Sequence, residues 1–186
     1  MIIALLGASG TGKSTIENIL ANKYGYKKIV SYTTRQPRNG EVEGKDYNFV
    51  DNSTFKDLIE NNVLAEWDEY SGERFYGTLK ADYEDDKKII VITPNGLRQL
   101  KKTLTDKQIF SVLIESGLGT RIKRYIDRCG VENFTYDDKN EIASRVDRDW
   151  SMFLGINREA DMVLYNEECT DIEQLAEKIV KTLEVR

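Results

Sequence analysis

The fold of this chain is set near its start by the segment Gly7-Ala8-Ser9-Gly10-Thr11-Gly12-Lys13-Ser14-Thr15. It has the spacing of a P-loop, in which Gly, any four residues, Gly, Lys and Ser follow one another. The apolar run Ile2–Leu6 before it predicts a buried strand, and the pattern after it predicts a helix over Lys13–Tyr24. This order places backbone N–H groups at a helix N-terminus, where the helix dipole favours anions.

The residue types of this loop explain how it would bind phosphate. The glycines let the backbone wrap around phosphate oxygens, Lys13 can reach the β- and γ-phosphates, and the Ser14 hydroxyl can ligate Mg²⁺. A glycine-rich turn without a ligand is the alternative, which the strand–loop–helix order disfavours. The residues predicted to contact a nucleoside triphosphate are Ser9, Gly10, Thr11, Gly12, Lys13, Ser14 and Thr15.

Short apolar runs recur along the chain, and a helical pattern follows each of them. Runs at 89–92, 109–114 and 162–165 resemble the first one in their content of Ile, Val and Leu. Such strands imply a parallel sheet with helices on both faces, which is an α/β fold of the P-loop NTPase type. Helices are predicted at Lys13–Tyr24, 95–104, 119–128, 138–153 and 170–183.

Between these strands the pattern changes. Short alternating stretches at 47–50 and 64–67, a short helix near 53–60 and the glycines Gly40, Gly44, Gly72 and Gly77 indicate a small β-rich lobe. We therefore expect one domain over 1–186, with a core at 1–31 and 88–186, a lobe at about 32–80 and a helical lid at about 119–148.

Composition limits the kinds of partner and of metal site. With 27 Lys and Arg against 32 Asp and Glu, the chain has no global attraction to nucleic acid or to a membrane. No His is present, and Cys129 and Cys169 lie far apart, so a zinc site or a disulfide framework is not expected. No apolar run reaches 18 residues, and Met1 to Leu6 lead straight into the glycine loop, so we expect a cytoplasmic protein.

A second anion site is predicted in the segment Ser31–Arg38, which directly follows a predicted strand. Arg35 and Arg38 flank Pro37, and two guanidinium groups on a stiff turn suit a phosphate. A solvated basic turn is the alternative. The segments that follow, at 40–50, 65–67 and 71–78, closely resemble the region of guanylate kinases that binds GMP.

The resemblance implies a role for individual residues. Glu66 would read the base, because a carboxylate can accept hydrogen bonds from guanine N1–H and its 2-amino group; a surface carboxylate is the alternative. For the two tyrosines the alternative is aromatic packing. The implied GMP-binding residues are Ser31, Arg35, Arg38, Tyr47, Glu66, Tyr76, Gly77 and Thr78.

The basic residues of 121–148 resemble the lid of nucleoside monophosphate kinases, whose arginines close over the transferring phosphoryl group. Asn166, after the last apolar run, resembles the residue that contacts the adenine of ATP. A solvated pair of charged helices is the alternative for the lid. The implied catalytic residues are Lys13, Arg35, Arg124, Arg128 and Arg145.

One strand departs from the family pattern. Guanylate kinases carry Asp residues in the strand that corresponds to 89–93, and one of them contacts the acceptor base and helps to organise the metal site. This chain has no Asp at Val91 or Thr93. Guanine selectivity is therefore not assured, and Mg²⁺ would be held on the protein side mainly by Ser14. Glu115 is a candidate for electrostatic substitution, with a structural role as its alternative.

The resemblance implies transfer of the γ-phosphoryl group of ATP to GMP or dGMP, with Mg²⁺ as cofactor. It implies small-molecule nucleotides as partners, no nucleic acid or membrane partner, and it leaves the oligomeric state open. Two alternatives stand beside it. One is a kinase of another nucleoside monophosphate or a ribose phosphate. The other is a catalytically silent protein-binding module, which the intact Lys13 and Ser14 disfavour.

Overall fold

The computed structural model describes residues 1–38, 40–69, 74–130, 132 and 134–185. The predicted turn at Ser71 and Gly72 lies outside the described residues, as do Val131 and Asn133 of the segment between the two helices of the predicted lid. Among the helices that the structure describes, none combines the length and the apolar character that crossing a bilayer requires.

The chain forms two compact units. The first consists of Met1–Ala4 and Tyr26–Ile109, and the second of Leu5–Gly25 and Phe110–Arg186. Strand β1 (Ile2–Leu6) begins in the first unit and ends in the second. The expected division into core, lobe and lid stays a prediction.

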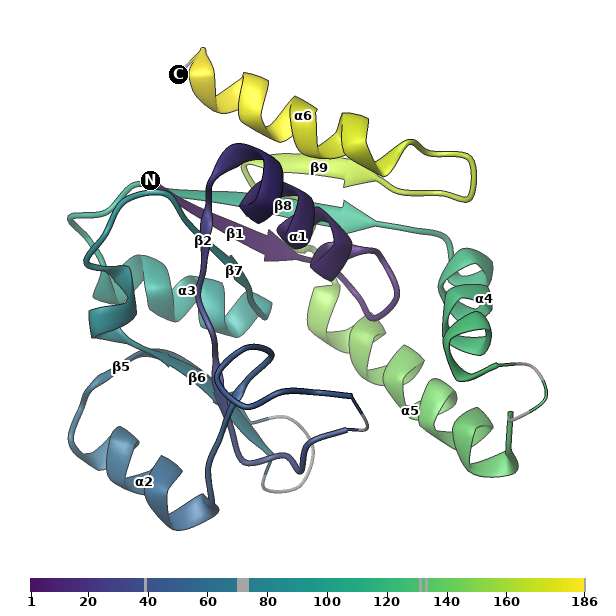
Figure 1. Cartoon of the computed structure of the whole chain (residues 1–186), viewed down its shortest axis with the longest axis horizontal. Coiled ribbons are helices and arrows are strands. Elements are labelled where there is room, and N and C mark those ends of the chain that lie inside the picture. Colours follow the sequence, from purple (N-terminus) through teal and green to yellow (C-terminus); the bar gives the residue numbers. More distant parts are fainter. Residues whose placement is uncertain (39, 70–73, 131, 133, 186) are drawn as a thin grey trace. The chain divides into compact units, whose positions relative to one another are not determined.

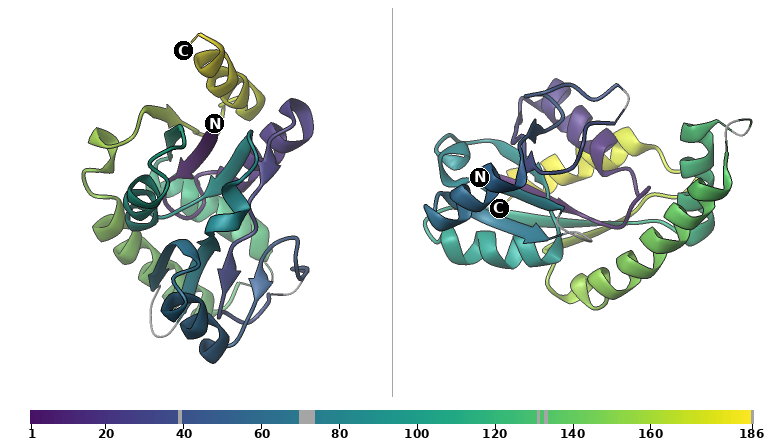
Figure 2. Two further views of the ribbon diagram at one scale, coloured as in Figure 1. Left: turned by 90° about the vertical axis from the view of Figure 1, so that its left-hand side faces the viewer. Right: turned by 90° about the horizontal axis from the view of Figure 1, so that it is seen from below.

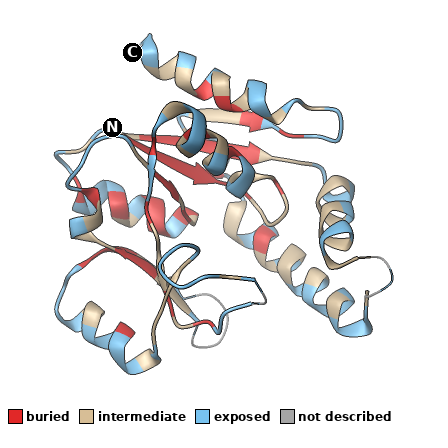
Figure 3. Ribbon diagram, in the orientation of Figure 1, coloured by how far each residue is buried: buried red, intermediate tan, exposed pale blue. Residues whose placement is uncertain are grey.

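The main sheet has five strands in the order β2-β7-β1-β8-β9 and is flanked by helices (Figure 1). Its other strands are β2 (Lys27–Lys28), β7 (Lys88–Val91), β8 (Ile109–Glu115) and β9 (Met162–Tyr165). β2 pairs with β7 in parallel, and so does β8 with β9. Each of the four predicted apolar runs is a strand, and β1 and β8 are buried along most of their length (Figure 3). The predicted α/β fold is confirmed.

In the second unit, α1 (Lys13–Tyr24) packs against α6 (Ile172–Glu184). Asp171 is the N-cap of α6, and its carboxylate accepts the N–H groups of Glu173 and Gln174. In the last turn of α1, Lys23 forms a hydrogen-bonded ion pair with Glu173 at 2.5 Å. These contacts fix the helix that carries the glycine loop at its N-terminus.

The second unit also contains the two helices of the predicted lid, α4 (Leu118–Cys129) and α5 (Tyr136–Phe153), which follow one another in the chain (Figures 1 and 2). The start of α5 is a capping box, in which Thr135 and Asp138 each accept the backbone N–H of the other. A short 3₁₀ helix, η3 (Ile156–Arg158), connects α5 to β9. The observed bounds of α4, α5 and α6 differ from the predicted ones by a few residues.

The first unit holds a second sheet, with the strand order β4-β3-β6-β5. These strands are β3 (Tyr32–Thr33), β4 (Asn48–Phe49), β5 (Leu64–Glu69) and β6 (Phe75–Leu79), and the helices beside them are α2 (Asn52–Glu60), η1 (Lys80–Tyr83) and α3 (Pro94–Thr103). β5 and β6 are antiparallel, β6 is also antiparallel to β3, and β3 is parallel to β4. The predicted β-rich segment is therefore a four-stranded sheet.

Aromatic packing holds one face of this sheet. Phe55 of α2 is fully buried and stacks on Phe75 with ring centroids 5.4 Å apart, and Trp67 lies 6.1 Å from Phe75. The side chains of Trp67 and Phe75 alternate along their strands with polar ones, as the period of two in a β-strand requires. The opposite face of β5 and β6 carries polar side chains.

Gly77 is the point where this packing is tightest. A Cβ added there would lie 2.8 Å from the Glu66 carbonyl oxygen, 2.9 Å from Trp67 Cβ and 3.1 Å from Phe55 Cζ. We expect Gly77→Ala to lower the free energy of unfolding by about 1–3 kcal/mol, because overpacking shifts the strand or the ring. Urea denaturation measures the change.

Gly119 provides the control, because a Cβ there would meet nothing within 4 Å and the residue lies in α4. Gly119→Ala is expected to leave stability unchanged or to raise it by up to about 1 kcal/mol, the helix propensity difference. Equal denaturation midpoints for Gly77→Ala and the wild type would contradict the close packing of β6.

Candidate functional site

The glycine loop of the second unit is shaped by backbone that approaches it closely. Gly7 has φ +145°, and a Cβ there would lie 2.3 Å from the carbonyl oxygen of Ile114 in β8. Gly12 has φ +94°, and a Cβ there would lie 2.4 Å from Nδ2 of Asn166. Both the conformation and the space exclude a side chain at these two positions. The end of β8 and the side chain of Asn166, which follows β9, therefore pack directly against the glycine loop.

Lys13 is folded into this loop. Its ammonium group donates hydrogen bonds to the carbonyl oxygens of Gly7 at 2.7 Å and Ala8 at 2.9 Å. Burial lowers the pKa of Lys13 to about 8; the charge of Asp149 opposes this change, and those of Arg121 and Arg128 add to it. A bound phosphate would favour the charged form, because an anion close to an ammonium group raises its pKa.

A buried carboxylate from α5 holds the middle of the loop. Asp149 is only 3% exposed, and its Oδ2 accepts the Ser9 N–H at 2.9 Å. Arg121 of α4 donates to the same Asp149 oxygen at 2.5 Å and to the Ser9 carbonyl at 2.8 Å. Sequence analysis missed Asp149, because its partners lie far away in the chain and no local pattern marks it.

Arg124 and Asn166 both contact the loop backbone. Arg124 donates to the Gly10 carbonyl at 3.0 Å and to the carbonyl and side-chain oxygens of Asn166 at 3.1 and 3.3 Å. Asn166 is 2% exposed and donates from Nδ2 to the Thr11 carbonyl at 2.8 Å. The structure thus brings together three predicted elements of the ATP site: the glycine loop, Arg124 and Asn166.

The other two predicted lid arginines have different surroundings. Arg145 pairs with Glu141 one turn earlier on α5, and its guanidinium lies 5.4 Å from the centre of the Tyr125 ring. Arg128 is exposed, and it contributes to the electrostatic environment of Lys13. Arg145 therefore makes its described contacts with residues of α4 and α5, whereas Arg128 is electrostatically linked to the loop lysine.

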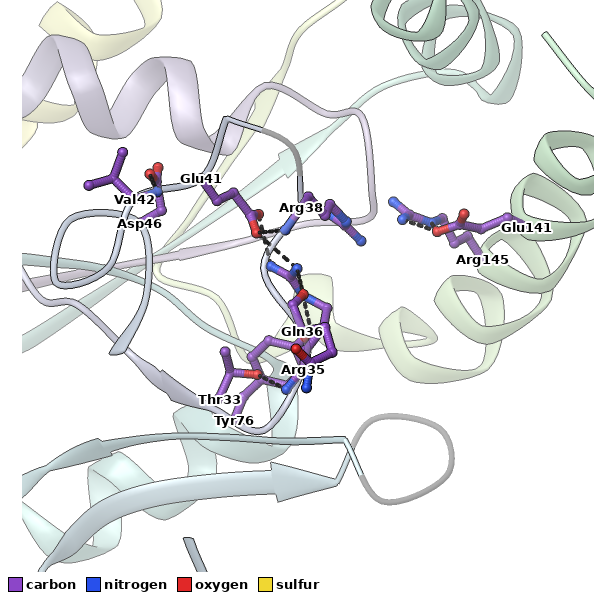
Figure 4. A network of polar contacts seen from close by, with 10 residues as sticks. All are labelled: Thr33, Arg35, Gln36, Arg38, Glu41, Val42, Asp46, Tyr76, Glu141 and Arg145. Carbon is purple, nitrogen blue, oxygen red and sulfur yellow. Dashed lines mark hydrogen bonds and ion pairs between the residues drawn. The ribbon is translucent and has the colours of Figure 1, made fainter. Parts of the chain in front are cut away.

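The predicted phosphate turn of the first unit is built around a buried Arg35. Its guanidinium makes a bidentate pair with Glu41, at 2.9 and 2.8 Å, and donates from Nε to the Tyr76 hydroxyl at 3.2 Å (Figure 4). The ring of Tyr47 lies 5.1 Å below it. The structure therefore brings Arg35, Tyr47 and Tyr76 together and adds Glu41, which sequence analysis missed. The alternative of a solvated basic turn does not hold for Arg35, which is 8% exposed.

Glu41 shows what this turn can bind. Its carboxylate accepts both guanidinium bonds of Arg35 and the backbone N–H of Arg38, at 2.7 Å. Burial works to raise the pKa of Glu41, but the hydrogen bonds from Arg35 and Arg38 outweigh it and hold the pKa below its ordinary value. The Arg38 side chain is exposed, and the described contact of Ser31 is its carbonyl, which accepts the Asn48 N–H. The predicted phosphate turn thus binds a carboxylate of the same chain, that of Glu41, through Arg35 and the Arg38 N–H.

The predicted base-reading residue lies on β5. Glu66 is 6% exposed, so the alternative of a surface carboxylate does not hold. Its Oε1 accepts the Thr78 hydroxyl at 2.9 Å, and its Oε2 lies where a Cβ on Gly96 would come within 2.5 Å. Because Thr78 uses its single proton on Glu66, Tyr83 donates to Thr78 at 2.8 Å. Gly77, between Tyr76 and Thr78, contributes close strand packing and no side-chain contact.

Burial raises the pKa of Glu66 to about 7; the hydrogen bond from Thr78 opposes this change, and the charge of Asp68 adds to it. Within the described part of the chain, Thr78 is the single hydrogen-bond donor to this carboxylate. A carboxylate can accept about four hydrogen bonds. Glu66 therefore keeps acceptor capacity for a ligand with N–H donors.

A divalent ion would depend on few protein ligands. Ser14 is exposed in the first turn of α1, where its hydroxyl suits one coordination position. The residues that the structure describes contain no group of three or more His, Cys, Asp or Glu side chains able to hold a metal. This donor set fits Mg²⁺ that is bound mainly through nucleotide phosphates and water.

Comparisons with known proteins agree with this geometry. The family model for guanylate kinase matches residues 1–183. A guanylate kinase of Trichodesmium erythraeum is 43% identical over 111 residues, which are 56% of this chain and 59% of that protein, less than two thirds of its length. One from Wolinella succinogenes is 34% identical over 191 residues, which cover 97% of this chain and 83% of that protein.

Among solved structures, the guanylate kinase of Anaplasma phagocytophilum matches with a TM-score of 0.70 at 25% identity, over 100% of this chain and 85% of that one. The family model covers nearly the whole chain, and the structural match extends over all of it. The chain belongs to the guanylate kinase family.

Proposed function

We propose that this protein transfers the γ-phosphoryl group of ATP to GMP or dGMP, giving ADP and GDP or dGDP. The observation that carries the proposal is the buried Glu66 with unused acceptor capacity. Guanine presents N1–H and the 2-amino group side by side, and a single carboxylate can accept both. Adenine has no such pair of donors on that edge.

On the acceptor side, the cluster of Arg35, Tyr47 and Tyr76 would bind the phosphate of GMP, with Ser31 and the exposed Arg38 completing it. The bidentate pair with Glu41 supports this assignment, because a phosphate offers the same paired oxygens with more charge. Thr78 would orient Glu66 toward the base, since its hydroxyl is fixed between Glu66 and Tyr83.

On the donor side, the loop amides from Ser9 to Thr15 would hold the phosphates of ATP, and Asn166 would contact the adenine. Lys13 would turn from the Gly7 and Ala8 carbonyls to the phosphates. Mg²⁺, with Ser14 as its protein ligand, would neutralise phosphate charge when bound. Arg124 would support the loop, while Arg128 and Arg145 would stabilise charge on the transferring group.

Catalysis then depends on positioning and on charge. No covalent protein intermediate is needed, because the acceptor phosphate oxygen attacks the γ-phosphorus directly. The rate would depend on holding two anionic substrates in line and on countering their charge with fixed cations. A silent binding module is disfavoured, because it has no use for Lys13 and the glycine loop that surrounds it.

A kinase of another nucleoside monophosphate remains a second candidate, because Val91 and Thr93 take the place of Asp residues. ADP formation from ATP with GMP, dGMP, AMP, UMP and dTMP in turn distinguishes the two. We expect turnover with GMP and dGMP and at least about 100-fold lower kcat/KM with the others, the range for a site that hydrogen-bonds its substrate. Retention of ATP without turnover on any acceptor would favour the binding module.

Lys13→Met tests the donor site. The variant keeps the apolar stem but loses the ammonium group, so kcat should fall by roughly 10³-fold while the folded state remains. A coupled ADP assay with GMP measures the rate, and thermal denaturation measures the fold.

Lys102→Met, which removes an exposed ammonium group from α3, is the matched control and should keep wild-type turnover. Wild-type kcat in Lys13→Met would remove the glycine loop from the mechanism.

Glu66 predicts how GMP use depends on pH. GMP donates hydrogen bonds, so it needs the ionised carboxylate, and the pKa of Glu66 is raised to about 7. For the wild type, kcat/KM for GMP should therefore fall as pH drops below 7, while the KM for ATP stays constant. In Glu66→Gln, kcat/KM for GMP should be roughly 10²-fold lower and lack this pH dependence.

Stability provides the control for Glu66→Gln. The raised pKa of Glu66 means that its contribution to stability is fully present below pH 4.5 and is lost as pH rises through 7. Above pH 7 the buried charge costs up to about 3 kcal/mol, so the Gln variant should unfold at higher urea concentration than the wild type there, with no such gain below pH 4.5. Equal loss of ATP and GMP affinity would show that Glu66 does not read the base.

A further inference from the structure

A second carboxylate lies beside Glu66 on the same face of β5. Residues two apart on a strand point to the same side, so Asp68 shares the face of Glu66. Across the strand pair, Glu66 is opposite Thr78 and Asp68 is opposite Tyr76. This face therefore carries the base-reading carboxylate, its orienting hydroxyl and one member of the phosphate cluster, with Asp68 among them.

Asp68 is held at the N-terminus of α3. Thr93 Oγ1 donates to Asp68 Oδ2 at 2.7 Å and accepts the Gly96 N–H at 3.0 Å, and Asn95 Nδ2 donates to Asp68 Oδ1 at 3.1 Å. These bonds use one acceptor position on each oxygen of Asp68, which leaves further lone pairs. Thr93 is one of the two positions where the sequence lacks Asp. The side chain at that position thus contacts a carboxylate that comes from β5, a strand of the other sheet.

Glu66 and Asp68 converge on the same small region. Gly96, which lies against Glu66 Oε2, is also bonded through Thr93 to Asp68. The charge of Asp68 contributes to the raised pKa of Glu66, which places the two groups within electrostatic reach of each other. Two neighbouring carboxylates destabilise each other unless donors lie between or around them. The N–H groups of a guanine base would supply such donors.

We propose that Asp68 is a specificity-determining residue that accepts a hydrogen bond from the second N–H of the 2-amino group of the acceptor guanine, while Glu66 accepts N1–H and the first N–H of that amino group. The proposal rests on the proposed function. It gives the chain a base-reading pair on one strand, β5, in place of a carboxylate at position 91 or 93. Thr93 and Asn95 act as positioning residues that fix Asp68.

The competing explanation is that Asp68 serves only to brace the start of α3. IMP separates the two, because hypoxanthine keeps N1–H and lacks the 2-amino group. In Asp68→Asn, kcat/KM for GMP should fall by roughly 10- to 100-fold, as for loss of one substrate hydrogen bond, while the value for IMP changes less than about threefold. The KM for ATP should not change. Calorimetric Kd values for GMP and IMP provide a second reading of the same ratio.

The double variant Asp68→Asn with Thr93→Asp is the rescue. It returns a carboxylate to the same hydrogen-bonded location from the N-cap of α3, and Asp remains a good helix N-cap. Preference for GMP over IMP should recover at least about tenfold relative to Asp68→Asn, a change that a bracing role alone would not produce. Glu60→Gln, on the exposed surface of α2, is the matched control and should keep the wild-type ratio.

Equal losses with GMP and IMP, accompanied by a lower melting temperature, would overturn the proposal in favour of a bracing role. An unchanged GMP to IMP ratio in Asp68→Asn would overturn it as well. Failure of the proposed function is distinguishable, because the wild type itself would then form no ADP with GMP.

Discussion

Burying a charged group without a partner costs several kcal/mol, and a site for charged substrates has to meet that cost before any substrate arrives. Among the described residues, three charged groups at the predicted sites have partners within the chain. Lys13 donates to two carbonyls of its own loop, Arg35 pairs with Glu41, and Asp149 pairs with Arg121. Glu66 has no charged partner of this kind in the described part of the chain. Burial raises its pKa to about 7 and so favours the neutral acid.

These contacts within the chain differ in strength. The two carbonyls that bind Lys13 are neutral, so a phosphate can outcompete them, whereas the pair of Arg35 with Glu41 is bidentate and charged. A ligand that replaces Glu41 must therefore carry paired oxygens and at least equal charge, which a phosphate monoester does. Asp149 is braced by both Ser9 and Arg121, and such a group maintains loop shape and has no need to move.

Much of the fold could be predicted from sequence, because the signals are local. The glycine loop and the strands β1, β7, β8 and β9 are marked by spacing and by apolar runs. The two-residue strands β2 and β3 are too short for any periodic pattern, and pairing with longer strands creates them. Arg35 was indicated by its pairing with Arg38 around Pro37. Glu66 and Asn166 were indicated through resemblance, since each stands alone as an ordinary polar residue in the sequence.

The missed residues are three carboxylates. The carboxylate of Glu41 acts through an arginine six positions earlier, that of Asp149 through a loop at the other end of the chain, and that of Asp68 through the start of α3. For Asp149 and Asp68, tertiary structure alone brings the partners together. Glu41 lies in the same turn as its partners, and no spacing or residue pattern marks it. All three carboxylates lie close to groups that are predicted to bind substrate, and their hydrogen bonds in the folded structure show this.

Asp68 illustrates why the absence of a residue in a strand need not remove its chemistry. A base is read by charge and by lone pairs at points in space. Thr93, the N-cap of α3, lies 2.7 Å from the carboxylate of Asp68 on β5, although β5 and β7 belong to different sheets. Thr93 is well suited to such an exchange, because its hydroxyl can cap α3 and still donate to a carboxylate from β5. The helix N-terminus favours an anion there whichever strand supplies it. Recognition by this lobe therefore depends on where acceptor oxygens lie against α3, and a sequence comparison made position by position would overlook the group that provides them.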